Sequence, residues 1–495
     1  MLDFVVGLLV AVYGLALCFV LFHSISDAHL IYHYLVSSRK KRIIPLSDNQ
    51  PNVTIQLPIY NEVYVAERLI DAIAAINYPA EKLEIQVLDD STDETTEVIA
   101  TKVAYLQQRN INIRQIRRAN REGFKAGALK HGLALAMGDL IAIFDADFLP
   151  QKDFLQKTIP YFGDEHIGMV QTKWGHINKN ASLLTSLQAI ALDGHFSIEQ
   201  TGRNAAGYFI NFNGTGGIWR KECILNAGNW EADTLTEDLD LSYRAQLKGW
   251  KFIYLEDVVT PAELPPVISA FKSQQFRWAK GGAETARKIL KKILKSNLPF
   301  IVKWHGLFHL IYSFGFVSII TSLILSLPLI FVRTYYPQYN TFFKTTAIIG
   351  ISFLVYIVHY FISHVKNTKG SAGKKLATFV IRFPLFVSLF MGVSLNNAFG
   401  IVQGYMGIKS AFVRTPKFNR GVVNNSLTEN KYTESRINIT TIIEGILILY
   451  FLFGIILSLE FKSYATLPLF IIAATGFSIV FISSIMEREL TIKKA

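Results

Sequence analysis

The fold is decided by a short apolar run that ends in acidic residues, Asp139-Leu-Ile-Ala-Ile-Phe-Asp145-Ala-Asp147. An earlier run, Glu84-Ile-Gln-Val-Leu-Asp89-Asp90, has the same form, and Val53-Thr-Ile-Gln-Leu-Pro58 precedes both. Short apolar runs of this kind predict buried strands, and the segments between them have amphipathic helical patterns. Because strands alternate with helices, we expect residues 52–265 to form a doubly wound, mostly parallel but mixed α/β sheet.

Acidic residues close two of these predicted strands, and the carboxyl ends of such strands form the ligand-binding edge of a sheet. Asp145 and Asp147 therefore lie where a nucleotide is expected, and two carboxylates so placed suit a divalent cation, Mg²⁺ or Mn²⁺. In this prediction Asp147, rather than Asp145, contacts the cation directly. Asp89 and Asp90 allow a second interpretation, since Asp is also favoured at a helix N-cap and near the positive end of the helix dipole.

The composition predicts a soluble domain joined to membrane-spanning helices. Of the 495 residues, 51% are apolar and 18% are charged, which is too apolar for an ordinary soluble chain and too charged for one wholly in lipid. The two cysteines, Cys18 and Cys223, cannot supply a disulfide framework, which fits a reducing compartment. A net charge of +12 favours contact with anionic membrane lipid, and no basic recognition helix indicates nucleic acid.

Five apolar runs are long enough to cross a membrane. They cover residues 4–22, 305–331, 345–363, 438–459 and 465–486. With the N-terminus outside, the basic cluster 39–42, the lysines of 366–375 and the C-terminal Lys493 and Lys494 all fall on the cytoplasmic side. We therefore expect an integral protein of the cell or inner membrane whose soluble domain is cytoplasmic. The corresponding units are an uncleaved N-terminal anchor (1–35) and two pairs of spans (301–365 and 437–487).

Two segments lie at the membrane surface in this prediction. Residues 266–300 contain the basic amphipathic stretch 286–295, which favours an interfacial helix. Residues 377–407 are apolar but interrupted by Pro384 and several polar side chains, so we expect an interfacial or re-entrant helix there. A sixth crossing would place the basic segment that follows, 408–436, on the outside.

Two further motifs follow in the chain, Thr236-Glu237-Asp238 and Gln274-Gln-Phe-Arg277-Trp278. Together with the two acidic strand ends, and in this order, they resemble the signatures of the family 2 glycosyltransferases. They are most similar to the membrane-embedded processive branch, which includes cellulose and hyaluronan synthases and the plant mannan, glucomannan and xyloglucan-backbone synthases. The resemblance extends over nearly the whole chain. It implies a glycosyltransferase A-type sheet domain joined to an α-helical transmembrane bundle.

The resemblance implies a nucleotide-sugar site and a catalytic base. The implied nucleotide contacts are Glu62, Asp89, Asp90, Lys125, Arg277, Thr415 and Lys417. The implied catalytic motif is Thr236, Glu237 and Asp238, with Asp238 as the base that takes the proton of an acceptor hydroxyl. The residue patterns alone also allow Lys125 to be a solvated lysine at a helix start, and Thr236 to be the N-cap of an acidic helix.

The resemblance also implies an acceptor site and a gate. Phe212-Asn-Gly-Thr-Gly-Gly-Ile-Trp-Arg220 is similar to a run of the plant mannan synthases, and Q-x-x-R-W is the signature of polymerising members. The implied acceptor contacts are Asn213, Gly214, Thr215, Gln274 and Trp278. A membrane-surface anchor is the alternative for the second motif. Phe412-Val-Arg-Thr415-Pro-Lys417 resembles the gating loop of cellulose synthases, although Arg414 and Pro416 depart from it.

The implied reaction is metal-dependent transfer of a hexose, with inversion, from UDP-glucose or GDP-mannose to a growing β-linked polysaccharide that then passes through the spans. Transfer of a single sugar to a membrane lipid is the alternative within the same chemistry. A transporter or scaffold is a third class. It is disfavoured because transporters place charged groups inside spans, and the last two predicted spans hold almost none before their edges.

Overall fold

The structure is a computed structural model that describes residues 1–37, 50–410, 415–417, 419 and 438–492. Several sequence predictions lie outside the described residues. They concern the basic cluster 39–42, Phe412 and Arg414 with most of the gating-type segment 408–436, and Lys493 and Lys494. Thr415, Pro416 and Lys417 of the gating-type segment are described.

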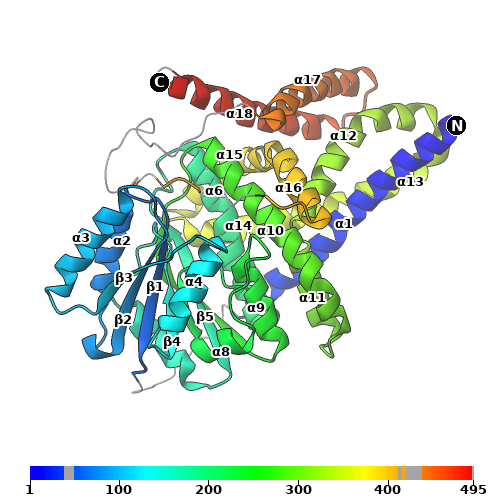
Figure 1. Cartoon of the computed structure of the whole chain (residues 1–495). Helices are drawn as coiled ribbons and strands as arrows, with labels where there is room; N and C mark the ends of the chain where they lie inside the picture. The colour runs from blue at the N-terminus through cyan, green and yellow to red at the C-terminus, as the bar shows by residue number, and fades with distance from the viewer. Residues whose placement is uncertain (38–49, 411–414, 418, 420–437, 493–495) are drawn as a thin grey trace.

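Within the described residues, seven strands form a single mixed sheet in the order β3-β2-β1-β4-β6-β5-β7 (Figure 1). The strands are β1 (Val53–Ile59), β2 (Leu83–Asp89), β3 (Ile113–Arg117), β4 (Leu140–Ile143), β5 (Ile167–His176), β6 (Gly217–Arg220) and β7 (Lys251–Ala262). β1 pairs in parallel with β2 and β4, and β6 runs antiparallel between β4 and β5. The doubly wound, mixed sheet predicted from the sequence is therefore confirmed.

Helices cover both faces of the sheet because its central strands are apolar on both sides. In β4, Leu140 packs into one core while its neighbour Ile141 packs into the other. One face carries α2 (Ala66–Ala74) and α3 (Thr95–Gln107), and the other carries α4 (Phe124–Leu135), α8 (Lys221–Asn226) and α9 (Glu237–Leu247). Shorter helical turns are η1 (Ala80–Lys82), α5 (Phe154–Thr158) and η2 (Ile159–Gly163). The carboxyl ends of β1, β2 and β4 thereby meet at one edge.

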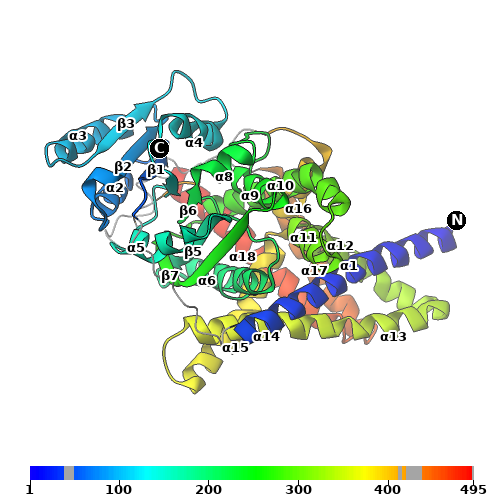
Figure 2. The same cartoon turned by 90° about the horizontal axis from the view of Figure 1, so that it is seen from below.

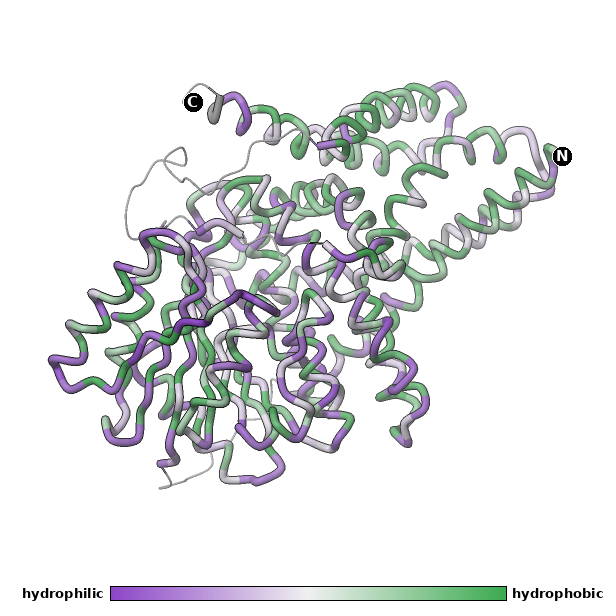
Figure 3. The backbone as a smooth tube through the Cα atoms, in the orientation of Figure 1, coloured by the Kyte–Doolittle hydropathy of each residue, from purple (hydrophilic) through white to green (hydrophobic). Residues whose placement is uncertain are grey.

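Six helices of the described chain are long and apolar enough to cross a membrane. They span Leu2–Ser37, Phe314–Tyr335, Pro337–Asn367, Ala372–Gly392, Ile439–Glu460 and Leu467–Glu489. Figure 3 shows hydrophobic residues concentrated along these helices, whereas the outer segments of the sheet domain are more hydrophilic. The helices indicate a membrane protein, in agreement with the sequence. Ala372–Gly392 is a candidate in addition to the five predicted runs.

The remaining helices surround the sheet domain or extend from it. They are α1 (Leu2–Ser37), α6 (Leu183–Gly194), η3 (His195–Gln200), α7 (Thr201–Ala206), α10 (Ile268–Lys295), α11 (Phe300–Leu310), α12 (Phe314–Tyr335), η4 (Pro337–Tyr339), α13 (Asn340–Ile348), α14 (Gly350–Asn367), α15 (Ala372–Gly392), α16 (Ser394–Met406), α17 (Ile439–Glu460) and α18 (Leu467–Ile492). α1 packs beside α12 and α14, and α17 packs on α18 (Figure 2). Cys18 on α1 and Cys223 on α8 are both free.

Two segments that the sequence predicts as single helices are each divided in two. Residues 305–331 cover parts of α11 and α12, and residues 377–407 cover most of α15 and all of α16. Asn396, Asn397 and Gln403 of the second segment belong to α16, which packs against α10. There the Asn396 side chain donates to the backbone oxygen of Lys272 at 3.0 Å. The apolar pattern continues across Val393, so it does not mark the boundary between α15 and α16.

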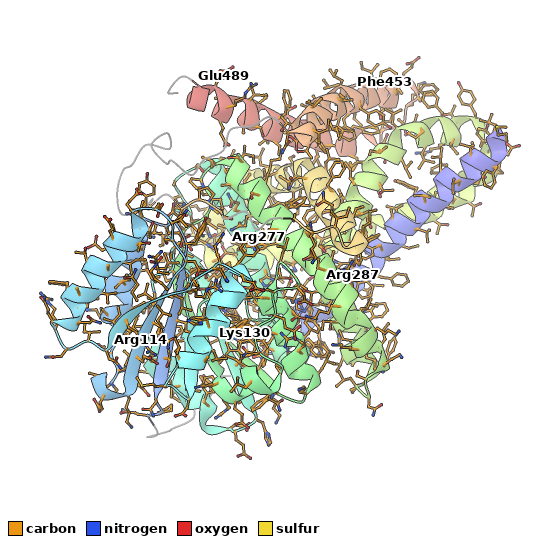
Figure 4. The ribbon with its side chains drawn as sticks, viewed as in Figure 1. Arg114, Lys130, Arg277, Arg287, Phe453 and Glu489 are labelled. Atoms are coloured by element: carbon orange, nitrogen blue, oxygen red, sulfur yellow. The ribbon has the colours of Figure 1, made fainter. Side chains whose placement is uncertain are left out.

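α10 joins the sheet domain to the membrane helices, and the predicted amphipathic stretch 286–295 is its last part. Figure 4 places Arg277 where α10 passes the sheet domain, well apart from Phe453 on α17. The Glu487 carboxylate of α18 accepts backbone N–H groups of Ile268 and Ser269 at the start of α10. The Lys272 ammonium pairs with the Glu444 carboxylate of α17 at 2.6 Å, and both groups are buried. α17 and α18 therefore hold the beginning of α10.

Candidate active site

A cleft opens between the carboxyl edge of the sheet and α10, with an empty volume of about 1270 Å³ that includes space open to solvent. Ligand pockets of enzymes commonly occupy this edge of an α/β sheet. Most of the predicted site residues line it together. These are Glu62, Asp90, Lys125, Asp145, Asp147, Asn213, Gly214, Thr236, Glu237, Asp238, Gln274, Arg277, Trp278, Thr415 and Lys417. The sequence thus brings residues from distant parts of the chain to one place.

Two predicted site residues, Asp89 and Thr215, lie behind the cleft instead of lining it. The Asp89 carboxylate accepts the backbone N–H of Ser91 and the side-chain amide of Gln115, each at 2.8 Å. The Thr215 hydroxyl accepts the backbone N–H of Asp145 at 2.8 Å. Both side chains are buried. Their contacts hold the loops that carry Asp90 and Asp145.

The Asp90 carboxylate is held by an arginine that the sequence analysis missed. Arg118 donates to its two oxygens at 2.9 and 2.5 Å, a bidentate geometry that fixes the plane of the carboxylate. Three residues further on, the Arg121 guanidinium lies 3.3 Å from the centre of the Tyr60 ring, at the wall of the cleft. The sequence signal for these contacts is that two arginines, Arg118 and Arg121, closely precede Lys125.

The two carboxylates of the predicted metal pair each meet a lysine. Asp145 accepts from Lys125 at 2.5 Å, and Asp147 pairs with Lys417 at 2.9 Å through Oδ2. Oδ1 of Asp147 is buried and has no hydrogen-bond partner among the described residues, which leaves an oxygen for a cation. Within the described chain, no third carboxylate or imidazole joins the pair at ligand distance. A cation here would complete its shell with phosphate and water oxygens, as Mg²⁺ commonly does.

A separate group of three carboxylates, on Glu231, Asp233 and Asp240, could also hold an ion by its geometry. A lysine ammonium group of the protein already lies between these three carboxylates. The Lys288 ammonium lies 2.5, 2.7 and 3.1 Å from oxygens of the three residues. We therefore assign this group to an ion-pair network that joins α9 and the loop before it to α10.

Lys125 connects the predicted metal pair to the loop 212–216, named the acceptor loop after its predicted role. Its ammonium donates to Asp145 and, at 2.9 Å, to the backbone oxygen of Gly214. Burial disfavours the charged lysine, but Asp145 and Glu237 outweigh burial and raise its pKa. The group is therefore a fixed positive charge inside the cleft, not a solvated lysine at a helix start.

Asp238 lies in the first turn of α9, directly opposite the acceptor loop. Burial is the main cause that raises its pKa to about 7, and the neighbouring Glu237 adds to the shift while Lys125 opposes it. Gly214 has φ of +80°, and a Cβ atom there would lie 3.0 Å from Oδ2 of Asp238. Only glycine fits this backbone without strain and without displacing the carboxylate.

Thr236 occupies the N-cap position of α9, as the sequence suggests, but its side chain makes no capping bond. Its hydroxyl instead lies 3.1 Å from the Thr285 hydroxyl of α10. Gly281 of α10 permits this approach, because a Cβ atom there would lie 2.5 Å from the Thr236 methyl group. The Thr236-Glu237-Asp238 motif therefore packs directly against α10.

α10 contributes Gln274, Arg277 and Trp278, whose spacing places them on one face of the helix. Burial lowers the pKa of Arg277, while Glu237 and Asp145 raise it. The guanidinium donates to the Thr415 hydroxyl at 3.3 Å, which links α10 to the described part of the gating-type segment. The Trp278 ring lies 6.4 Å from the ring of Trp174.

Comparison with known proteins agrees with this geometry. Residues 51–281 match the family described as "Glycosyltransferase like family 2". The chain carries a family 2 glycosyltransferase domain. The match begins just before β1 and ends within α10, so this domain holds every described cleft residue except Thr415 and Lys417.

The glycosyltransferase domain has curated relatives in plants. The chain is 42% identical over 281 residues to the probable glucomannan 4-beta-mannosyltransferase 4 of Oryza sativa subsp. japonica, covering 56% of this chain and 51% of that protein. It is 42% identical over 276 residues to glucomannan 4-beta-mannosyltransferase 2 of Arabidopsis thaliana, covering 55% of this chain and 51% of that protein. The chain spans about half the length of the curated relatives it matches.

A solved structure resembles the glycosyltransferase domain and its surroundings. It is a mannosyltransferase from Pyrobaculum calidifontis in complex with GDP-Man and Mn²⁺, with a TM-score of 0.54. The likeness covers 80% of this chain and 100% of that one, at 18% sequence identity. At that identity the likeness supports the glycosyltransferase A-type fold and nothing finer.

An aromatic wall of the glycosyltransferase domain also escaped the sequence analysis. Trp174, near the end of β5, lines the cleft, and its ring lies 5.2 Å from Phe148 and 5.1 Å from Phe196. With Trp278 it gives the cleft two indole rings from different elements. The signal was present, because Trp174 follows a strand-like run, but only the pairing of β5 with β7 brings it to the site.

Proposed function

We propose that this chain is an inverting hexosyltransferase that extends a β-linked polysaccharide from a nucleotide-sugar at the cytoplasmic face of a membrane. The observation that carries the proposal is Asp238, a carboxylate with a pKa of about 7 that faces the acceptor loop in a cleft also lined by Lys125 and Arg277. A carboxylate with such a pKa is suited to accept a proton near neutral pH.

In this mechanism, Asp238 takes the proton of an acceptor hydroxyl while that oxygen attacks the anomeric carbon of the donor sugar. The bond from this carbon to the nucleoside diphosphate breaks on the opposite face, so an α-linked donor gives a β-linkage. Negative charge then develops on the leaving diphosphate. The cations of Lys125, Arg277 and Lys417 line the cleft and would stabilise that charge.

Asp145 and Asp147 are the residues that would hold a divalent cation, Mg²⁺ or Mn²⁺. When bound, such an ion neutralises part of the diphosphate charge. The unpartnered oxygen of Asp147 supports this assignment, and the mannosyltransferase of similar fold was solved with Mn²⁺. Lys417 would exchange its contact with Asp147 for one with a phosphate when donor and cation bind.

The indole rings of Trp174 and Trp278 favour a sugar acceptor, because the faces of pyranose rings pack well on aromatic rings. The plant relatives are named as glucomannan 4-beta-mannosyltransferases, which favours GDP-mannose as donor and a β-1,4-linked chain as product. The apolar helices beside α10 would carry the growing chain across the membrane.

The test is incorporation of radiolabelled hexose by the purified chain in lipid vesicles. GDP-mannose and UDP-glucose are supplied separately, each with Mg²⁺, with Mn²⁺ or with a chelator. We expect cation-dependent label in a large product that a β-mannanase digests. Label found only in the lipid extract would replace the polymer with a glycolipid product. Absence of label from both donors, with neither donor bound, would reject the proposal.

A further inference from the structure

A π-helical turn, η3, interrupts the helical segment between α6 and α7 and contacts the acceptor loop. π-Turns are rare and often occur at functional sites. This one carries three polar side chains that the mechanism above does not use, His195, Glu199 and Gln200. Two of them hydrogen-bond to the side chain of Asn213, which lines the cleft next to Gly214.

The orientation of the Gln200 amide is fixed by its surroundings. Its nitrogen donates to the backbone oxygen of Asn211 at 2.9 Å and to Oδ1 of Asn213 at 2.8 Å. A backbone oxygen can only accept, so turning the amide over would set two oxygens against each other. Gln200 is fully buried, so water cannot repair such a mismatch.

The Gln200 orientation determines those of the next two groups. With Oδ1 of Asn213 facing Gln200, the Asn213 nitrogen faces Nε2 of His195 at 3.1 Å. Nε2 must therefore accept, and the imidazole is neutral with its proton on Nδ1. The Nδ1–H group faces the Glu199 carboxylate, with 3.2 Å between Nδ1 and Oε2. Arg203 also donates to Glu199 at 3.0 Å, which keeps the carboxylate an acceptor.

The backbone of Asn213 is held as well, because its N–H donates to the Gln171 side chain at 3.0 Å. An asparagine amide has two N–H groups, and His195 uses one. The second N–H of Asn213 therefore belongs to a side chain that lines the cleft. Its neighbour Gly214 lies so close to Asp238 that an added Cβ atom would be 3.0 Å from Oδ2.

We propose that His195 and Gln200 are positioning residues that hold the Asn213 amide so that its second N–H donates to a hydroxyl of the sugar acceptor beside Asp238. This inference rests on the proposed function and names a contact for its acceptor. It also requires a neutral His195. A proton on Nε2 would confront the Asn213 N–H, and the Asn213 amide cannot turn while Gln200 stays in place.

Three charged or titratable groups surround His195 and enter its pH dependence. Glu199 is on the same turn, Arg203 is on α7, and His309 approaches from α11. Arg203 and Glu199 form an ion pair, and burial lowers the pKa of His309 well below its ordinary value. As pH falls and His195 gains a proton, acceptor binding should weaken while donor binding does not change.

The test compares His195→Phe, His195→Gln and Gln200→Glu with a control, His131→Phe, at an exposed position of α4. The probes are a β-1,4-linked manno-oligosaccharide as acceptor and the donor that the wild-type chain uses. We expect His195→Phe and Gln200→Glu to raise the KM for the acceptor about tenfold, with the Kd for the donor unchanged; the factor corresponds to one lost hydrogen bond at about 1.4 kcal/mol. His195→Gln, which offers an oxygen at similar reach, should stay near the wild type and lose the rise in acceptor KM at low pH.

Each outcome has a distinct meaning. An unchanged acceptor KM in both His195→Phe and Gln200→Glu, with donor binding intact, would overturn the inference. If one of these variants fails to fold, the other decides. A rise in KM at low pH that persists in His195→Gln would overturn the requirement for a neutral imidazole. Absence of transfer by the wild-type chain would instead be a failure of the proposed function.

Discussion

The cleft and the membrane helices both bury ionisable groups, but they balance the charges differently. The membrane helices place their groups in one-to-one pairs, Glu444 with Lys272 of α10 at 2.6 Å and His359 with Asp27 at 2.9 Å. In the cleft the carboxylates are crowded, and burial beside Glu237 raises the pKa of Asp238 to about 7. Paired charges fix where helices lie, whereas crowding leaves one carboxylate ready to take a proton.

Asp238→Asn removes one of the crowded carboxylates of the cleft and should have the largest effect on activity. We expect the rate of sugar transfer to fall by about 10³-fold or more, because an amide cannot serve as the base, while donor affinity stays close to that of the wild type. Radiolabel incorporation measures the rate, and calorimetric titration with the donor measures the affinity. Glu165→Gln, at an exposed carboxylate, is the control. Transfer at the wild-type rate by Asp238→Asn would contradict the mechanism.

Lys272→Met removes the cation of the buried Lys272–Glu444 ion pair and should lower stability. It leaves the buried Glu444 carboxylate without its cation, and we expect the free energy of unfolding to fall by about 3–5 kcal/mol. The double variant Lys272→Met/Glu444→Leu removes both charges and should recover most of this loss. Unfolding in detergent, followed by circular dichroism, gives the comparison. Equal stability of the single and double variants would show that the pair is not the main link between α10 and α17.

Gly214→Ala should sharpen the comparison by moving the crowded carboxylate without removing it. The new Cβ atom would lie 3.0 Å from Oδ2 of Asp238, and we expect kcat to fall by about 10²-fold, as small displacements of a catalytic group often cause. Gly207→Ala is a matched control. Gly207 has φ of +70°, so the backbone strain is similar, but no atom lies within 4 Å of the added Cβ. Similar losses in both variants would attribute the effect to backbone strain.

The pH profile of kcat should show the smallest effect. Because the pKa of Asp238 is raised to about 7, its carboxylate gains a proton as pH falls below that value and can no longer act as a base. We expect kcat to fall about tenfold for each further pH unit on the acid side. Stopped assays between pH 5 and 9 measure this limb. A kcat that stays constant down to pH 5 would rule out Asp238 as the group that limits the rate.

The sequence predicted what depends on local pattern and missed what depends on distant contacts. The acidic strand ends could be placed at one edge because parallel strands share their carboxyl edge, and Asp145 and Asp147 lie there. The contact of His195 with Asn213 joins residues 18 apart, and that of Lys272 with Glu444 joins residues 172 apart. Neither pairing has a periodic signature.

The same distinction explains the misplaced helix boundaries. Apolar periodicity reports that a segment is buried, but lipid and protein bury it alike. α15 and α16 therefore had one pattern, although α16 packs on α10. The family resemblance implies that Asp89 contacts the nucleotide, and the positions of Ser91 and Gln115 show that its carboxylate also accepts two hydrogen bonds within the protein.

The contact between Glu487 and the start of α10 has a consequence for biosynthesis. Ile268 and Glu487 are 219 residues apart, so the ribosome makes the whole sheet domain long before it makes the carboxylate that completes α10. An emerging chain can fold the sheet domain early. The start of α10 gains its Glu487 contact only after α18 has been made, so the wall of the cleft that carries Gln274, Arg277 and Trp278 should become ordered last.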